Sequence, residues 1–147
     1  MTHAFGYIYH RIMNTKAFPV IPVNINTYYP PNQISPLRAY RLGRVLRECV
    51  ESWPEDLRVL VIATGGLSHF VVDEEFDRAF IEILRTGEAE GHARLPRAKL
   101  QSGNSELRCW SVLAGAVHDM SMTLIDYVPC YRSRAGTGCA MAYAYWN

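Results

Sequence analysis

The sequence lacks an excess of charge of either sign, since 15 Lys and Arg residues stand against 14 Asp and Glu residues, a net charge of +1. A chain with this balance is not expected to bind nucleic acid or an anionic membrane through a charged surface. The longest strongly apolar stretch, around Val59 to Ala63, is far too short to cross a bilayer. Since the first residues also lack the layout of a secretory signal, we expect a cytoplasmic protein with no membrane partner.

Cysteine is sparse, and no two cysteines form a CxxC pair. This predicts reduced, packed thiols rather than a disulfide framework for the four residues Cys49, Cys109, Cys130 and Cys139. The 147 residues are 49% hydrophobic and 20% charged, which is typical of a globular domain long enough to bury a core.

The spacing of apolar residues predicts strands and helices in one domain. Segments 18–26 and 58–66 read as strands, the second in a central or parallel position because it is apolar on both faces. Helices are predicted from Ser35 to Pro54, from Asp73 to Gly87 and over 107–117, where capping residues flank helical spacing. Two further strands, 122–130 and 138–146, are joined by a turn-rich connection. The order predicts an α/β fold, a mixed sheet with helices packed over it.

His69 is a candidate acid/base. It follows the apolar run and the pair Gly65 and Gly66, which allow a sharp turn and close approach of another group. An imidazole there can transfer protons near neutral pH. The alternative is that His69 ends the strand through a local hydrogen bond. Glu106 begins the third predicted helix, where a carboxylate is either a metal ligand or a complement to the helix dipole.

Three other polar positions carry weaker signals. Ser133 lies in the turn YRSRAGTG, which can offer a hydroxyl and backbone N–H groups to an anion, or can be an ordinary hairpin turn. His3 and His10 flank an aromatic run and can share one helical face. His92 has no acidic or thiol partner at ligand spacing, so it is interpreted as a surface residue.

Four segments resemble one family, and they occur in the family's order: HAFGYIYHRIM, PVNINTYYPPNQISPLR, VIATGGLSHFVVDEEFDR with LQSGNSELRCW, and DYVPCYRSRAGTGCAMAYAYW. Together they resemble the class III extradiol ring-cleavage dioxygenases, the family of the catalytic subunit of protocatechuate 4,5-dioxygenase. The gallate and 3-O-methylgallate dioxygenases resemble the chain most. The resemblance covers essentially all 147 residues and implies the C-terminal part of that family's fold.

The resemblance implies a mononuclear non-haem Fe(II) held by two histidines and one glutamate. It implies that O2 cleaves a catecholic acid such as gallate, 3-O-methylgallate or protocatechuate beside its hydroxyls. Glu106 matches the carboxylate ligand and His69 matches the acid/base near the substrate hydroxyl. For substrate binding, His3 matches a pocket histidine and Ser133 matches the residue that bonds the substrate carboxylate.

The sequence departs from the family in one respect. The two metal histidines precede the HAFGY segment in the family, and nothing here matches that region. We therefore expect residues 1–147 to form a single partial domain that needs an N-terminal half or a complementing subunit, and that associates as a homo-oligomer through exposed apolar surfaces. Two alternatives stay open: a non-catalytic binding or assembly module, and a self-sufficient variant in which His3 and His10 join Glu106 around a metal.

Overall fold

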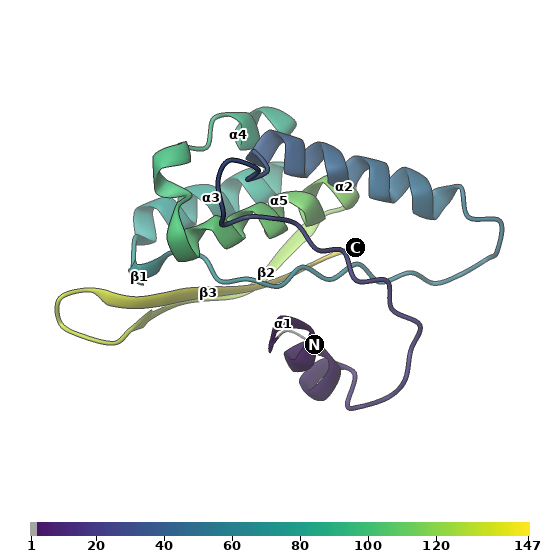
Figure 1. The fold of residues 1–147 in the computed structure, drawn as a ribbon, viewed down its shortest axis with the longest axis horizontal. Helices are drawn as coiled ribbons and strands as arrows, with labels where there is room; N and C mark the ends of the chain where they lie inside the picture. The colour runs from purple at the N-terminus through teal and green to yellow at the C-terminus, as the bar shows by residue number, and fades with distance from the viewer. Residues whose placement is uncertain (1–2) are drawn as a thin grey trace.

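The computed structural model describes residues 3–147 and places a layer of helices on one side of a small sheet (Figure 1). The elements in chain order are α1 (His3–Tyr7), the π-helix η1 (Ile8–Ile12), α2 (Pro36–Glu51), β1 (His69–Val71), α3 (Glu74–Thr86), α4 (Ala89–Ala93), the 3-10 helices η2 (Arg97–Lys99) and η3 (Ser102–Glu106), α5 (Leu107–Ala116), β2 (Met122–Tyr131) and β3 (Thr137–Trp146). The predicted α/β class, with helices packed over a sheet, is confirmed.

The predicted start of α2 and both predicted ends of α3 are confirmed, because local interactions set them. Helix α2 ends at Glu51, before the predicted stop at Pro54. The Ser35 hydroxyl accepts a bond from the Arg38 backbone N–H at 3.3 Å, and Pro36 follows at the first helical position. The Asp73 carboxylate caps α3 by accepting from the Phe76 N–H at 3.0 Å. Gly87 ends that helix with φ of 68°, a left-handed conformation that glycine adopts without strain.

The sheet has the order β1-β3-β2, and both pairings are antiparallel. The predicted hairpin of the last two strands is confirmed, with Met122 opposite Trp146 and Cys130 opposite Cys139. On its other edge, β3 pairs with β1, which places His69 opposite Cys139. Strand β3 is therefore central among the described strands, and it brings the histidine of the GGLSH segment to the sheet.

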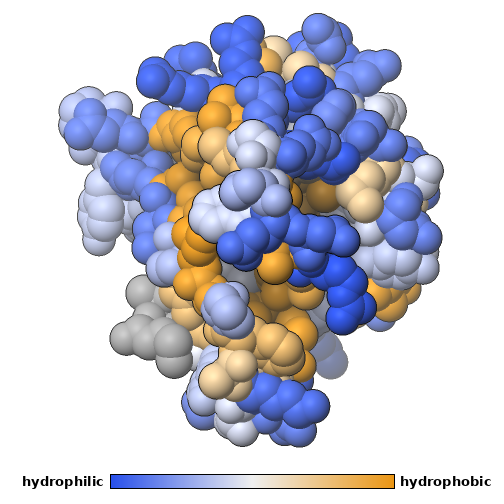
Figure 2. Space-filling model, turned by 90° about the vertical axis from the view of Figure 1, so that its right-hand side faces the viewer, coloured by the Kyte–Doolittle hydropathy of each residue, from blue (hydrophilic) through white to orange (hydrophobic). Residues whose placement is uncertain are grey.

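Two predicted strands are wrong. Residues 18–26 and 58–66 form no strand, and residues 18–26 and 58–62 lie largely on the surface. Ile21 is 84% exposed and Leu60 is 77% exposed. A strand needs a hydrogen-bonded neighbour, and within residues 3–147 neither segment has one. Figure 2 shows apolar side chains gathered in a band across one face of the molecule.

The core lies between the helices and the sheet. Its largest fully buried apolar side chains are Phe80, Leu67, Leu84, Leu100 and Leu107. Helices α2 and α5 cross closely at two glycines; a Cβ on Gly115 would lie 1.9 Å from the Tyr40 carbonyl oxygen. This crossing needs a residue without a side chain.

The interpretation of His92 as a surface residue is wrong, because its side chain is fully buried beside the ring of Tyr40, with centroids 5.0 Å apart. His92 lies on α4, which has only the five residues Ala89–Ala93. A helix this short has too few positions for hydrophobic periodicity to predict which side chains are buried. None of the described helices is both long and apolar enough to span a membrane.

Candidate functional site

His69 is held by one hydrogen bond at its backbone and one at its ring. Its backbone N–H donates to the Asn104 side-chain oxygen at 2.6 Å, and its ring Nδ1 lies 2.8 Å from the Leu67 carbonyl oxygen. A carbonyl oxygen only accepts, so Nδ1 carries the proton of the neutral imidazole and Nε2 has a free lone pair. The local hydrogen bond of the alternative interpretation is therefore present, and it leaves Nε2 available as a base.

Glu106 lies at the junction of η3 and α5, with its carboxylate turned toward His69. Its Oε2 accepts a hydrogen bond from the Gly66 backbone N–H at 2.9 Å. His69 Nε2 and Glu106 Oε2 are 3.9 Å apart, and the two side chains are 21% and 41% exposed. The structure thus brings together two of the four predicted site residues, and both remain accessible to a ligand.

The Gly-Gly pair makes this proximity possible. Gly65 has φ of +147°, and a Cβ there would lie 2.9 Å from the Glu106 Cβ. A Cβ on Gly66 would lie 2.7 Å from His69 Cε1. The turn is also held from α5, because the Trp110 indole N–H donates to the Gly65 carbonyl at 3.0 Å. Any side chain at these glycines would push the carboxylate or the imidazole out of place.

The thiols beside the pair stay protonated at neutral pH. Burial, and then the Glu106 charge, raise the pKa of Cys109 to about 11. The same two causes, in the same order, raise the pKa of Cys139. A thiol must lose its proton to bind a metal or attack an electrophile. Neither thiol is therefore a thiolate nucleophile at neutral pH.

The described residues do not complete a metal site by themselves. Across residues 3–147, no group of three His, Cys, Asp or Glu side chains is placed to hold an ion. An Fe(II) site of the facial type takes three protein ligands. Of those, the donor set here offers Glu106, with His69 Nε2 close beside it.

The loop that follows Thr27 and carries Tyr28 and Tyr29 is held by hydrogen bonds next to Glu106. The Arg108 guanidinium donates to the carbonyl oxygens of Thr27, at 3.1 Å, and Leu100, at 2.8 Å. The Ser105 hydroxyl donates to the Thr27 hydroxyl at 3.2 Å. Because Arg108 is almost fully buried, these bonds hold the loop that follows Thr27 against the start of α5.

Two residues that shape the site were missed by the sequence reasoning. One is Asn104, which accepts from the His69 N–H and donates to the Lys99 carbonyl at 3.0 Å. The other is Asp77, which is fully buried and accepts from both the N–H and the hydroxyl of Ser68, at 2.9 and 2.6 Å. The sequence did carry a signal for Asp77, since it shares the apolar face of α3 with buried Phe80.

Ser133 lies apart from this pair, in the turn of the β2–β3 hairpin. Its exposed hydroxyl is 2.7 Å from the Thr137 hydroxyl. Together with Tyr131, Arg132, Arg134 and Gly136 it lines a shallow hollow. Two arginines make this turn attractive to an anion. The prediction that Ser133 binds the substrate carboxylate stays a prediction.

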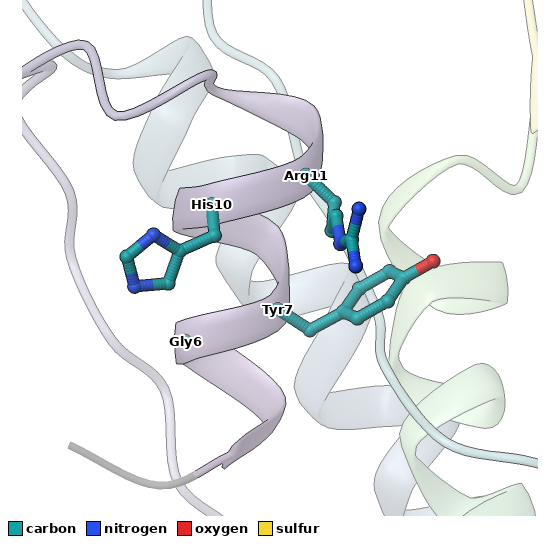
Figure 3. A pocket seen from close by; sticks show the side chains of 4 residues that line it. All are labelled: Gly6, Tyr7, His10 and Arg11. Atoms are coloured by element: carbon teal, nitrogen blue, oxygen red, sulfur yellow. The ribbon is translucent and has the colours of Figure 1, made fainter.

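Of the two N-terminal histidines, the structure describes the side chain of His10, and it lies away from the pair. The side chain of His3 lies outside the described residues. His10, in η1, packs edge-on against Tyr9 with ring centroids 5.2 Å apart. It also lines an open hollow of about 520 Å³ with Gly6, Tyr7 and Arg11, and Figure 3 shows it leaving the helix on the opposite side from Tyr7 and Arg11.

Comparison with known proteins gives a family and two relatives. A family model described as the catalytic LigB subunit of aromatic ring-opening dioxygenase matches residues 7–136. A gallate dioxygenase of Pseudomonas putida is 38% identical over 72 residues, which are 44% of this chain and 21% of the relative. A 2,3-dihydroxyphenylpropionate/2,3-dihydroxicinnamic acid 1,2-dioxygenase of Xanthobacter autotrophicus is 47% identical over 53 residues, 35% of this chain and 16% of the relative. Since the family model matches most of its residues, the chain belongs to the family of the catalytic LigB subunit of aromatic ring-opening dioxygenase.

Proposed function

We propose that residues 1–147 are a single partial domain of a non-haem Fe(II) extradiol dioxygenase that uses O2 to open the ring of a catecholic acid. In this proposal His69 is the acid/base, Glu106 is a metal ligand, and His3 and Ser133 bind the substrate. The observation that carries the proposal is the 3.9 Å separation of His69 Nε2 and Glu106 Oε2 at one accessible position. The family match and the gallate dioxygenase relative support the reaction class.

His69 would act on the substrate hydroxyl. Because its Nδ1 proton is held by the Leu67 carbonyl, Nε2 is the nitrogen that can accept a proton from a catecholic hydroxyl beside Glu106. The resulting imidazolium would keep its Nδ1–H bond to Leu67 and can return the proton later in the reaction. When bound, Fe(II) would supply the redox chemistry that activates the ring and O2.

Two further ligands have to come from polypeptide outside the described residues, from an N-terminal half, a complementing subunit or a second copy. The exposed apolar segments 18–26 and 58–63 support such a partner, because large exposed apolar surfaces mark interaction sites. Leu60 and Ile21 are the most exposed of their large side chains. The chain would thus supply only part of the Fe(II) ligand set, and Glu106 is the ligand that it supplies.

The substrate proposal is a catecholic acid with gallate, 3-O-methylgallate or protocatechuate as the first compounds to test. A substrate carboxylate would bond the Ser133 hydroxyl in the hairpin turn, where Arg132 and Arg134 add positive charge. The relative from Xanthobacter autotrophicus, whose name includes 2,3-dihydroxyphenylpropionate, adds that compound to the panel.

The test is complementation. The chain is mixed with the part of the Pseudomonas putida gallate dioxygenase that precedes the matched segment, and iron content and O2 uptake are measured on each compound. We expect iron binding and ring cleavage only in the mixture. Stoichiometric iron on the chain alone would contradict the need for outside ligands, and inactivity of a stable mixture would favour a non-catalytic binding or assembly module.

Single substitutions separate the two roles in the active mixture. His69→Ala should remove most turnover, by roughly 10²–10⁴-fold for a lost acid/base, while iron stays bound. Glu106→Gln should release the iron. Glu82→Gln, an exposed change on α3, is the matched control and should leave both unchanged. Loss of iron from the His69 variant would mean that its assigned role is wrong.

A further inference from the structure

Asp77 is a fully buried carboxylate with no cationic partner within ion-pair distance among residues 3–147. Burying an unpaired carboxylate costs several kcal/mol, and an apolar residue on the same face of α3 would avoid that penalty. Three hydrogen bonds offset the penalty, from the Ser68 N–H at 2.9 Å, the Ser68 hydroxyl at 2.6 Å and the Tyr127 hydroxyl at 2.9 Å. Two of the three go to the residue that precedes His69.

The segment before His69 is fixed on both sides as a result. From one side Asp77 holds Ser68 by its backbone and its hydroxyl, and that hydroxyl also accepts from the Asp73 N–H at 2.9 Å. From the other side Ala140 of β3 exchanges backbone bonds, donating to the Ser68 carbonyl and accepting from the Leu67 N–H, both at 2.8 Å. The Leu67 carbonyl that binds Nδ1 of His69 therefore has little freedom to turn away.

We propose that Asp77 is a positioning residue for His69. Its carboxylate, acting through Ser68, aims the Leu67 carbonyl at Nδ1, so that the imidazole keeps the tautomer with its Nε2 lone pair toward Glu106. The proposal rests on the proposed function, in which that lone pair accepts the substrate proton. It assigns a purpose to a buried acid that the ring-cleavage chemistry does not otherwise use.

A purely structural role would act through the other hydrogen bond. Tyr127 lies on β2, and its bond to Asp77 ties α3 to the sheet. The guanidinium of Arg78 lies over the same tyrosine ring at 5.0 Å, so this link also belongs to the α3–sheet contact. Removing it should loosen the packing of α3 while leaving Ser68 and His69 in place. Substitutions of Ser68 and of Tyr127 each remove one hydrogen bond to the same carboxylate, so the two variants form a matched pair.

The tautomer of His69 is the readout, measured by nitrogen NMR on the histidine-labelled full chain. The sample is kept in a mild detergent that covers the apolar segments, at an alkaline pH where imidazoles are neutral. The unaltered chain should show one tautomer, with the Nδ1 and Nε2 resonances well separated. One hydrogen bond of typical strength biases the two tautomers by about fivefold.

Ser68→Ala, which keeps Asp77 but removes the hydroxyl link, should move the two resonances toward the mixture of free imidazole. Asp77→Ala should do so further where it folds. Tyr127→Phe is the control and should keep the single tautomer despite a lower unfolding free energy. Retention of the single tautomer in Ser68→Ala, or its equal loss in Tyr127→Phe, would overturn the proposal.

The measurement needs neither iron nor substrate. A tautomer that shifts as expected, in a chain that never supports ring cleavage, would refute the proposed function alone. A tautomer that does not respond would refute the role of Asp77 alone, whatever the activity of the complemented enzyme.

Discussion

Acidification should destabilise the folded chain through His92, whose imidazole is buried beside Tyr40 and Phe80. The Ser111 hydroxyl donates to the Leu107 carbonyl at 3.3 Å, so the bond between His92 Nδ1 and that hydroxyl, at 3.0 Å, has the imidazole as donor. His92 Nε2 is buried without a hydrogen-bond partner. Protonation would place a charge and an unpaired N–H there, and this burial lowers the pKa of His92 from 6.5 to about 4.

The sign and size of the effect follow from that shift. The unfolded chain takes up the proton near pH 6.5, whereas the folded chain takes it up only near pH 4. The stability contributed by neutral His92 is thus complete above the unfolded pKa and is lost as the pH falls from there toward the folded value. At about 1.4 kcal/mol for each pKa unit, the loss is about 3 kcal/mol. That is a large part of the roughly 5–15 kcal/mol by which domains are stable.

The assay is urea unfolding of the chain at a series of pH values between neutral and about pH 4. A loss of about 3 kcal/mol lowers the urea midpoint by about 1–3 M. His92→Gln, which cannot titrate, should be less stable at neutral pH but should lose less on acidification. Groups common to both chains, such as buried Asp77, whose pKa is raised by burial and whose effect has the opposite sign, cancel in the comparison.

Exposed His10 gives the matched control, since His10→Gln should keep the full pH dependence of the unaltered chain. Parallel loss of stability in the unaltered and His92→Gln chains would refute the reasoning. It would show that the buried site admits water or relaxes enough to accept the charge.

Three other outcomes can be checked on the same preparations. Gly65→Ala should lower the unfolding free energy by about 1–3 kcal/mol, because the new Cβ meets Glu106 and the φ of +147° suits only glycine. Gly115→Ala should lower the unfolding free energy by at least as much, through overpacking against α2. Gly6→Ala is the control and should not lower it, because its Cβ would meet nothing within 4 Å. Equal effects of the two substitutions in urea titrations would contradict the packing argument. The unaltered chain should self-associate in light scattering and Leu60→Asp should reduce this, so a monodisperse unaltered monomer would count against an interaction surface.

Strand prediction failed where it depended on partners. The alternating apolar pattern of 122–131 and 137–146 was sufficient because the two segments pair with each other across a short turn. The equally apolar segment 58–63 has no neighbour among the described residues and stays exposed. An apolar pattern reports what a segment would bury, whereas the backbone hydrogen bonds of a strand come from elsewhere in the chain or from another chain.

The candidate site, like the strands, could be predicted from the sequence only in part. His69 and Glu106 were singled out by their local settings and by the family resemblance, but nothing local shows that their side chains lie 3.9 Å apart. That distance depends on the bond from Gly66 to Glu106 and on β1 pairing with β3. The position of Asp77 on the apolar face of α3 is visible in the sequence, but its bonds to Ser68 and Tyr127 depend on the fold.

The sequence by itself determined the start of α2, both ends of α3 and the closing hairpin. These features depend on helix caps, on the left-handed conformation of Gly87 and on the alternation of apolar residues in strands. All of them act between residues that are near one another in the chain, so they can be predicted without the fold. Only the tertiary structure decided which polar side chains meet beside Gly65 and Gly66, and that His92 is buried. Those outcomes depend on contacts between distant segments, and their energies arise only once the segments have packed together.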